Sequence, residues 1–126
     1  MKITDIEELK NMARTIRKGI IEQVYSANSG HPGGSLSIAD ILTVLYFNEL
    51  NIDEKNPKWE DRDRMILSKG HCSPALYSCL ANRGFFDKEE LNNIYFTSKN
   101  KIEVDALLER INITESEDLF NELKEF

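Results

Sequence analysis

The sequence predicts a mostly α-helical protein with one short strand. Apolar residues recur every three or four positions through residues 5–27, which is the spacing of an amphipathic helix. Two glycine-rich segments, the first histidine turn (28–34) and the second histidine turn (68–74), are each followed by another helical pattern. A single apolar run with charge before it and a glycine after it, 63–68, has the length and flanks of a strand.

Length and composition indicate one soluble domain. The chain has 126 residues, of which 40% are hydrophobic and 30% charged. Its formal net charge of -6 argues against non-specific binding to nucleic acid or to an anionic membrane. The start has no apolar core of a signal peptide, and no apolar run approaches the roughly 20 residues that span a bilayer. Cys72 and Cys79 lie too far apart on one helix for a disulfide, so we expect a reduced, cytoplasmic protein.

The helices can be placed one after another. Acidic residues in its first turn support a helix over 5–27, and the first histidine turn ends it. A capping box from Ser37 to Asp40 predicts a second helix that runs to about residue 50. Pro74 suits the first turn of a third helix, 75–82. Three further short helices are expected at 87–93, 102–111 and 115–125.

Both histidines of the chain, His31 and His71, lie in the two glycine-rich turns. Such turns let the backbone approach a ligand closely while rigid elements on either side hold them. His71 also precedes a helix start, where free N–H groups and the helix dipole favour an anion such as phosphate. With Lys69 nearby, the second histidine turn is a candidate phosphate site.

Three other interpretations of the histidines stay open at this point. Loop histidines are more often solvent-exposed than ligand-binding. A metal site made of His31, His71 and Cys72 is conceivable, although adjacent residues seldom converge on one ion. A histidine–cysteine nucleophile pair is also conceivable, but nothing in the sequence marks the third group that would orient it.

The two turns resemble a known pair of motifs. Ser-Gly-His-Pro-Gly-Gly at 29–34, followed by Ile-Ala-Asp at 38–40, resembles the first signature of transketolases. Asp-Arg-Met-Ile-Leu-Ser-Lys-Gly-His at 63–71, with Leu-Tyr after it, resembles the second. Both motifs occur in the family's order within residues 7–92, and the short acidic start resembles the N-terminal subunit of split transketolases.

The resemblance implies an enzyme that transfers a two-carbon ketol unit between sugar phosphates, as in the pentose phosphate pathway, with thiamine diphosphate and Mg²⁺. The fold would then be an incomplete N-terminal part of an α/β thiamine diphosphate-binding domain. By the same resemblance, His31 is the catalytic residue that contacts substrate and assists proton transfer. The residues implied in cofactor binding are His71, Gly34, Lys69 and Gly70, with Gly34 limited to a backbone contact.

The sequence departs from the family after residue 93. The family's Mg²⁺ motif, Gly-Asp-Gly completed by an asparagine, is absent because no glycine follows Gly84, so we assign no metal ligands. We therefore divide the chain into a transketolase-like segment, 1–93, and an unmatched acidic helical tail, 94–126. We expect this chain alone to be inactive. It could be a truncated gene product, a piece that needs a complementary transketolase chain or a homo-oligomer, or a non-enzymatic interaction module.

Overall fold

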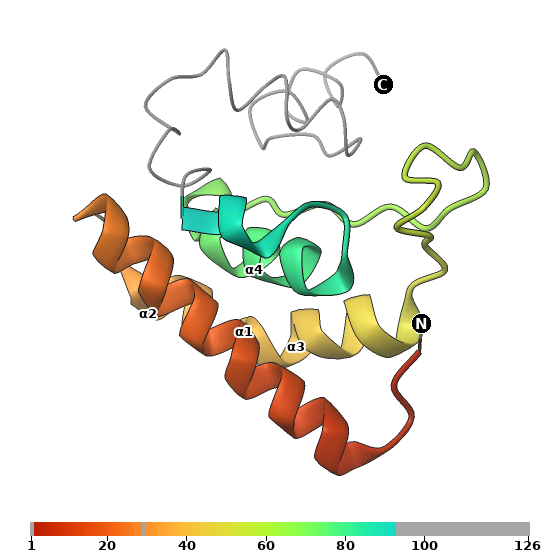
Figure 1. Cartoon of the computed structure of the whole chain (residues 1–126), viewed down its shortest axis with the longest axis horizontal. Coiled ribbons are helices and arrows are strands. Elements are labelled where there is room, and N and C mark those ends of the chain that lie inside the picture. The colour runs from red at the N-terminus through yellow and green to blue at the C-terminus, as the bar shows by residue number, and fades with distance from the viewer. Residues whose placement is uncertain (1, 29, 93–126) are drawn as a thin grey trace.

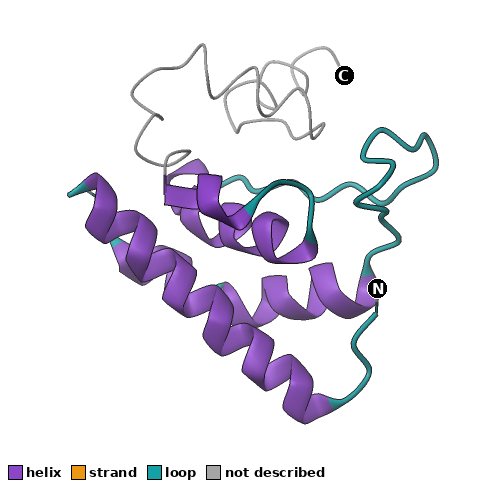
Figure 2. Cartoon of the chain, viewed as in Figure 1, coloured by secondary structure: helices purple, strands orange, loops and turns teal. Residues whose placement is uncertain are grey.

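The computed structural model describes residues 2–28 and 30–92, and its regular elements there are all helical (Figure 2). The elements are α1 (Ile6–Ala27), α2 (Pro32–Leu36), α3 (Ala39–Val44), the π-helical turn η1 (Leu45–Glu49), the 3-10 turn η2 (Gly70–Cys72), α4 (Ser73–Arg83) and the 3-10 turn η3 (Lys88–Glu90). The predicted, mostly helical fold is confirmed. The helices expected at 102–111 and 115–125 lie outside the described residues.

The core lies where the three longest α-helices meet. In Figure 1, α4 lies over the angle between α1 and α3. The core side chains with the largest volumes that are fully buried come from α1, α3, η1 and α4: Ile16, Ile20, Leu42, Phe47 and Leu80. Burying each of them stabilises the fold by roughly 1.5–3 kcal/mol. This packing fixes the start of α4 beside the C-terminal half of α1, where the two histidine turns lie.

Helix α1 agrees with the predicted range, and its close approach to α4 depends on a glycine. The Asp5 carboxylate caps its first turn by accepting a hydrogen bond from the Glu8 backbone N–H at 3.0 Å. A methyl group at Gly19 would lie 2.3 Å from Ser78 Oγ. That hydroxyl donates to the Ile16 carbonyl at 3.0 Å, so α1 and α4 are joined by a hydrogen bond at this contact.

The second predicted helix is confirmed over residues 39–49, whereas the prediction for residues 28–38 is wrong in its details. Helix α2 forms inside the segment that was expected to be an irregular turn, with Pro32 in its first turn, where a missing N–H costs little. The Ser37 hydroxyl does not open a capping box: it donates to the Gly34 carbonyl at 2.8 Å. The next helix therefore starts at Ala39 and ends in a π-helical turn, in which Leu50 N–H donates to Leu45 C=O at 2.8 Å.

The predicted strand at 63–68 is also wrong, because no strand is present in the described residues. The apolar run is only half buried: Met65 and Leu67 are partly buried against the core, and Ile66 between them is 57% exposed. A strand, however, is defined by a ladder of backbone bonds to a neighbour, and in the described residues this run has only the bond from the Asp63 N–H to the Asn51 carbonyl at its start.

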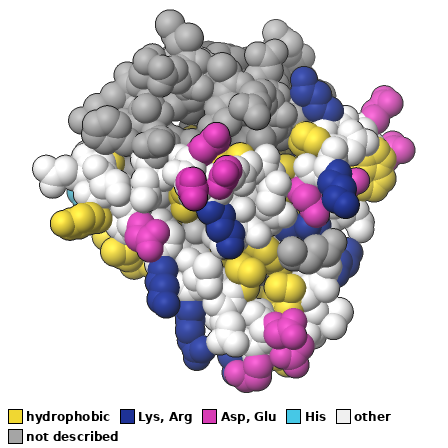
Figure 3. Space-filling view, viewed as in Figure 1, with side chains coloured by type: hydrophobic (Ala, Val, Ile, Leu, Met, Phe, Trp, Pro, Cys, Tyr) yellow, Lys and Arg dark blue, Asp and Glu magenta, His cyan; other side chains and the backbone are white. Residues whose placement is uncertain are grey.

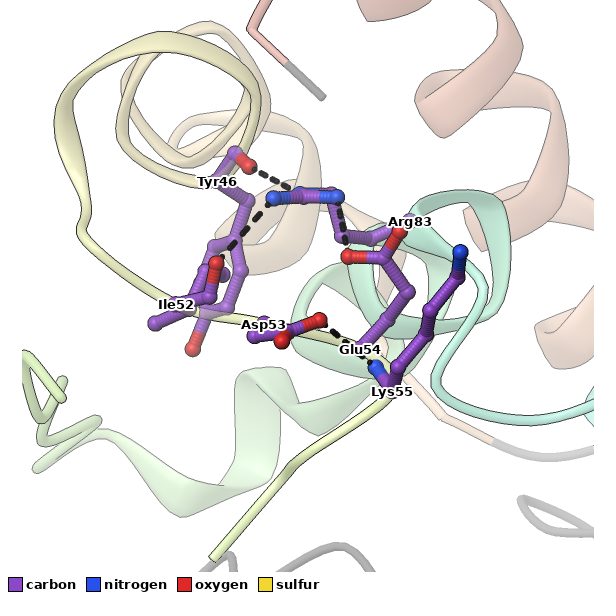
Figure 4. A network of polar contacts seen from close by, with 6 residues as sticks. All are labelled: Tyr46, Ile52, Asp53, Glu54, Lys55 and Arg83. Carbon is purple, nitrogen blue, oxygen red and sulfur yellow. Dashed lines mark hydrogen bonds and ion pairs between the residues drawn. The ribbon is translucent and has the colours of Figure 1, made fainter. Parts of the chain in front are cut away.

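Helix α4 begins and ends close to the predicted bounds, and a buried ion pair lies at its C-terminus. Gly84, with φ 97°, ends the helix in the left-handed conformation that glycine adopts without strain. Figure 4 shows the Arg83 guanidinium between η1 and the following loop. Its Nη1 pairs with Glu54 Oε2 at 2.6 Å, while Nε donates to the Tyr46 carbonyl at 2.9 Å. The predicted helix at 87–93 is represented by η3, where the Asp87 carboxylate accepts from Glu89 N–H at 3.0 Å.

Both cysteines are buried and free, in agreement with the predicted absence of a disulfide between them. Burial raises the pKa of the Cys79 thiol. Burial is also the main cause that raises the pKa of Tyr46, and the nearby Cys79 thiolate would raise it further, so both groups stay protonated in the core.

Acidic and basic side chains are interspersed on the face of the molecule that Figure 3 shows. Among residues 2–28 and 30–92, no helix has the length and apolarity to cross a membrane.

Candidate functional site

The second histidine turn is built on η2 and the start of α4. Gly70, His71 and Cys72 form one 3-10 turn, closed by the Cys72 N–H donating to the Lys69 carbonyl at 2.9 Å. Cys72 is also the N-cap of α4, but its side chain makes no capping hydrogen bond. The Ser73 N–H donates to the Gly70 carbonyl and Pro74 has no N–H, so it is chiefly the helix dipole that favours an anion at this helix end.

The first histidine turn lies at the end of α1. Gly30 has φ 113°, which lets the chain reverse direction there. His31 is the N-cap of α2, is exposed, and makes no side-chain capping hydrogen bond. Its imidazole is therefore open to solvent and to any ligand that approaches from that side.

The structure brings the two turns together at Gly34. A methyl group on Gly34 would lie 2.6 Å from Cys72 Sγ and 3.8 Å from His71 Nε2. The side chains of Cys72 and His71, both from the second turn, therefore lie beside this glycine. Lys69, also from the second turn, forms hydrogen bonds to the segment that contains Gly34. Its Nζ donates to the Gly34 carbonyl at 2.9 Å and to Ser37 Oγ at 3.2 Å.

Of the five predicted site residues, two others therefore lie at Gly34: Lys69 donates to its carbonyl, and the His71 ring lies within 4 Å of where its methyl group would be. Gly70 belongs to the same 3-10 turn as His71. His31 lies on the neighbouring turn, three residues before Gly34, and no hydrogen bond joins the two imidazoles in the described residues. From the sequence the turns were interpreted one at a time, and the structure places them side by side at Gly34.

Two buried polar residues beside this site were missed. The Gln23 side chain is fully buried, and its Nε2 donates to the Pro74 carbonyl at 2.9 Å and to the Gly19 carbonyl at 3.0 Å. It thereby ties the start of α4 to α1. Ser35, next to Gly34, is also fully buried, and its hydroxyl has no hydrogen-bond partner among the described residues. Gln23 could have been noticed, because it continues the buried stripe of Ile16 and Ile20 as a polar residue.

The site suits an anion better than a metal ion. Lys69 supplies a cation, the start of α4 supplies a positive dipole end, and the partnerless Ser35 hydroxyl lies beside Gly34 in sequence. By contrast, the described residues contain no group of three His, Cys, Asp or Glu side chains that could hold a metal ion. The donors present fit part of a diphosphate.

Comparison with known proteins finds the same family that the motifs of the two histidine turns resemble. Residues 8–106 match the family model described as "Transketolase, thiamine diphosphate binding domain". The chain is 47% identical over 87 residues to the 6-deoxy-6-sulfo-D-fructose transketolase subunit SqwG of Clostridium sp. strain MSTE9, covering 69% of this chain and 32% of that protein. It is 43% identical over 84 residues to an apulose-4-phosphate transketolase subunit of Phocaeicola vulgatus, covering 67% and 30%. Against transketolase 1 of Aliivibrio fischeri, the identity is 46% over 85 residues, covering 67% and 13%. The chain thus spans about a third or less of the length of these relatives.

Proposed function

The chain belongs to the transketolase family, and on this premise we propose that it contributes the two histidine turns of a thiamine diphosphate site in a two-subunit transketolase. The observation that carries the proposal is the contact at Gly34. It sets both turns and the Lys69 ammonium at the start of α4, where a diphosphate is favoured.

The residues have separate roles in this proposal. His71, Gly70 and the first turn of α4 bind the diphosphate, with Lys69 and the Gly34 backbone beside them. His31, exposed on the neighbouring turn, contacts the sugar phosphate and moves the proton of the hydroxyl next to the bond that breaks. When bound, the cofactor supplies the carbanion that ketol transfer requires. Mg²⁺ would need ligands that residues 2–28 and 30–92 do not offer.

A titration with inorganic diphosphate tests the proposed site. Weak binding is expected, with a dissociation constant of about 1 mM. The amide resonances of Gly70–Ala75 should report it in labelled protein. His71→Ala should weaken the affinity more than His31→Ala, because only His71 lies on the turn at the start of α4. Equal effects of the two substitutions, or no response at saturating diphosphate, would contradict the assignment.

We further propose that this polypeptide does not catalyse ketol transfer by itself and works in the cytoplasm with a complementary transketolase chain. The reasons are the missing metal ligands and the share of about a third that it covers in the subunit relatives. A coupled assay with xylulose and ribose phosphates, Mg²⁺ and thiamine diphosphate checks this. Turnover of about 1 per second or more from this chain alone would refute the proposed dependence on a partner.

A further inference from the structure

Lys69 belongs to one histidine turn through its backbone and to the other through its side chain. Its carbonyl accepts the Cys72 N–H at 2.9 Å, which closes the 3-10 turn that carries His71. Its ammonium donates to the Gly34 carbonyl at 2.9 Å and to Ser37 Oγ at 3.2 Å, both at the end of α2. Lys69 is therefore placed to transmit the position of either turn to the other.

The ammonium and its two acceptors are all hydrogen-bonded to one another. Ser37 Oγ accepts from Lys69 and donates its own proton to the Gly34 carbonyl at 2.8 Å. The carbonyl thus receives two hydrogen bonds, one of them from a charged donor, which is the stronger kind. Within residues 30–38 and 68–74, the hydrogen bonds that connect the two turns all come from Lys69 Nζ.

The packing around Gly34 links these hydrogen bonds to the position of His71. Gly34 lies against Cys72 and His71, so fixing the Gly34 carbonyl also fixes the surface on which His71 Nε2 rests. Cys72 is fully buried and cannot move aside into solvent. His31 is the N-cap of the same short helix, which ends one residue before Ser37.

We infer that Lys69 is a positioning residue, which holds the turn of His31 against the turn of His71 through Gly34 and Ser37. This inference rests on the proposed function for its consequence, since it assigns Lys69 the task of shaping the diphosphate site. A direct contact between the ammonium and the diphosphate is the competing role. The two roles differ in what happens when no ligand is present.

Amide hydrogen exchange of the full chain without ligand is the deciding measurement. Lys69→Met keeps the aliphatic stem and removes the donors, so exchange at Ser35–Ser37 and at Cys72 should become about tenfold faster. Ser37→Ala should give a smaller change in the same direction, because the Gly34 carbonyl keeps its bond from Lys69. Lys69→Arg, which retains charge and donors, should restore most of the protection. Exchange at Ser78–Leu80 should not change, because these residues lie in the core of α4.

Lys58→Met controls for the loss of one positive charge at an exposed position, and it should leave both turns unaffected. Unchanged exchange at Ser35–Ser37 in Lys69→Met would overturn the inference. So would a Lys58→Met variant that behaves like Lys69→Met. Faster exchange throughout α4 in Lys69→Met would also overturn it, since the effect would then be global instability.

A second arm separates the inference from the proposed function. The ratio of the inorganic diphosphate dissociation constants of Lys69→Met and the unaltered chain is measured at low salt and at 0.5 M salt. A positioning role predicts that part of the loss persists at 0.5 M salt, whereas a purely electrostatic contribution of the ammonium predicts that the ratio falls to one as salt screens the charge. If the unaltered chain binds no diphosphate, the proposed site is wrong, and the exchange measurement still decides the role of Lys69.

Discussion

Replacing Arg83 by methionine is expected to lower the free energy of unfolding by about 3 kcal/mol. The guanidinium is 2% exposed and is bound to Glu54 and to the Tyr46 and Ile52 carbonyls, so its removal leaves buried acceptors without donors (Figure 4). Methionine retains the apolar stem, which limits the loss to the polar contacts. Chemical denaturation followed by circular dichroism measures the change.

The exposed ion pair between Arg17 and Asp40 provides a matched control. Its nitrogen–oxygen distance of 2.6 Å equals that of the Arg83 pair, but the two side chains are 38% and 78% exposed. Arg17→Met should therefore change the free energy of unfolding by no more than about 0.5 kcal/mol. Equal losses in Arg17→Met and Arg83→Met would show that burial does not set the strength of these pairs.

Gly34→Ala is expected to cost about 1–3 kcal/mol of stability and to weaken diphosphate binding. The added methyl group would lie 2.6 Å from the fully buried sulfur of Cys72, so one of the two turns must shift. Helix propensity alone would favour the substitution by about 0.5–1 kcal/mol, so the contact with Cys72 decides the sign. Gly33→Ala is the control, because a methyl group there meets nothing within 4 Å and should be neutral or slightly stabilising.

The double variant of Gly34→Ala with Cys72→Ala tests whether these two residues fit each other. Removing the sulfur makes room for the methyl group, so the double variant should be more stable than the sum of the single changes by about 1 kcal/mol or more. Strict additivity would mean that the two turns do not touch at this point, and the site described above would lose its structural basis.

Helices α1 and α4 could be predicted closely because strong local signals bound them. Asp5 caps α1 and Gly84 ends α4, and both signals act within one turn of the helix. The prediction for the segment around α2 was wrong, because its three glycines and its proline indicated an irregular turn, whereas Pro32 starts a short helix. The prediction of the strand was wrong for a different reason: a short apolar run does not show whether a neighbouring strand exists to pair with it.

The candidate site could be predicted in its residues and not in its assembly. The motifs pointed to His31, His71, Lys69 and Gly34, yet the bond from Lys69 to Gly34 spans 35 positions in the sequence. No local pattern reports such a contact. Ser37 was assigned to a helix cap that does not form, and its hydroxyl serves the contact between the turns.

The central claim is that both histidine turns belong to one diphosphate site. Titrating thiamine diphosphate into the labelled full chain, and following the amides of Gly34–Leu36 and of Gly70–Ala75 together, tests it most directly. One site predicts that both groups of resonances shift with the same dissociation constant, because Gly34 lies against His71 and Cys72. A response confined to one turn, or two different dissociation constants, would contradict the claim.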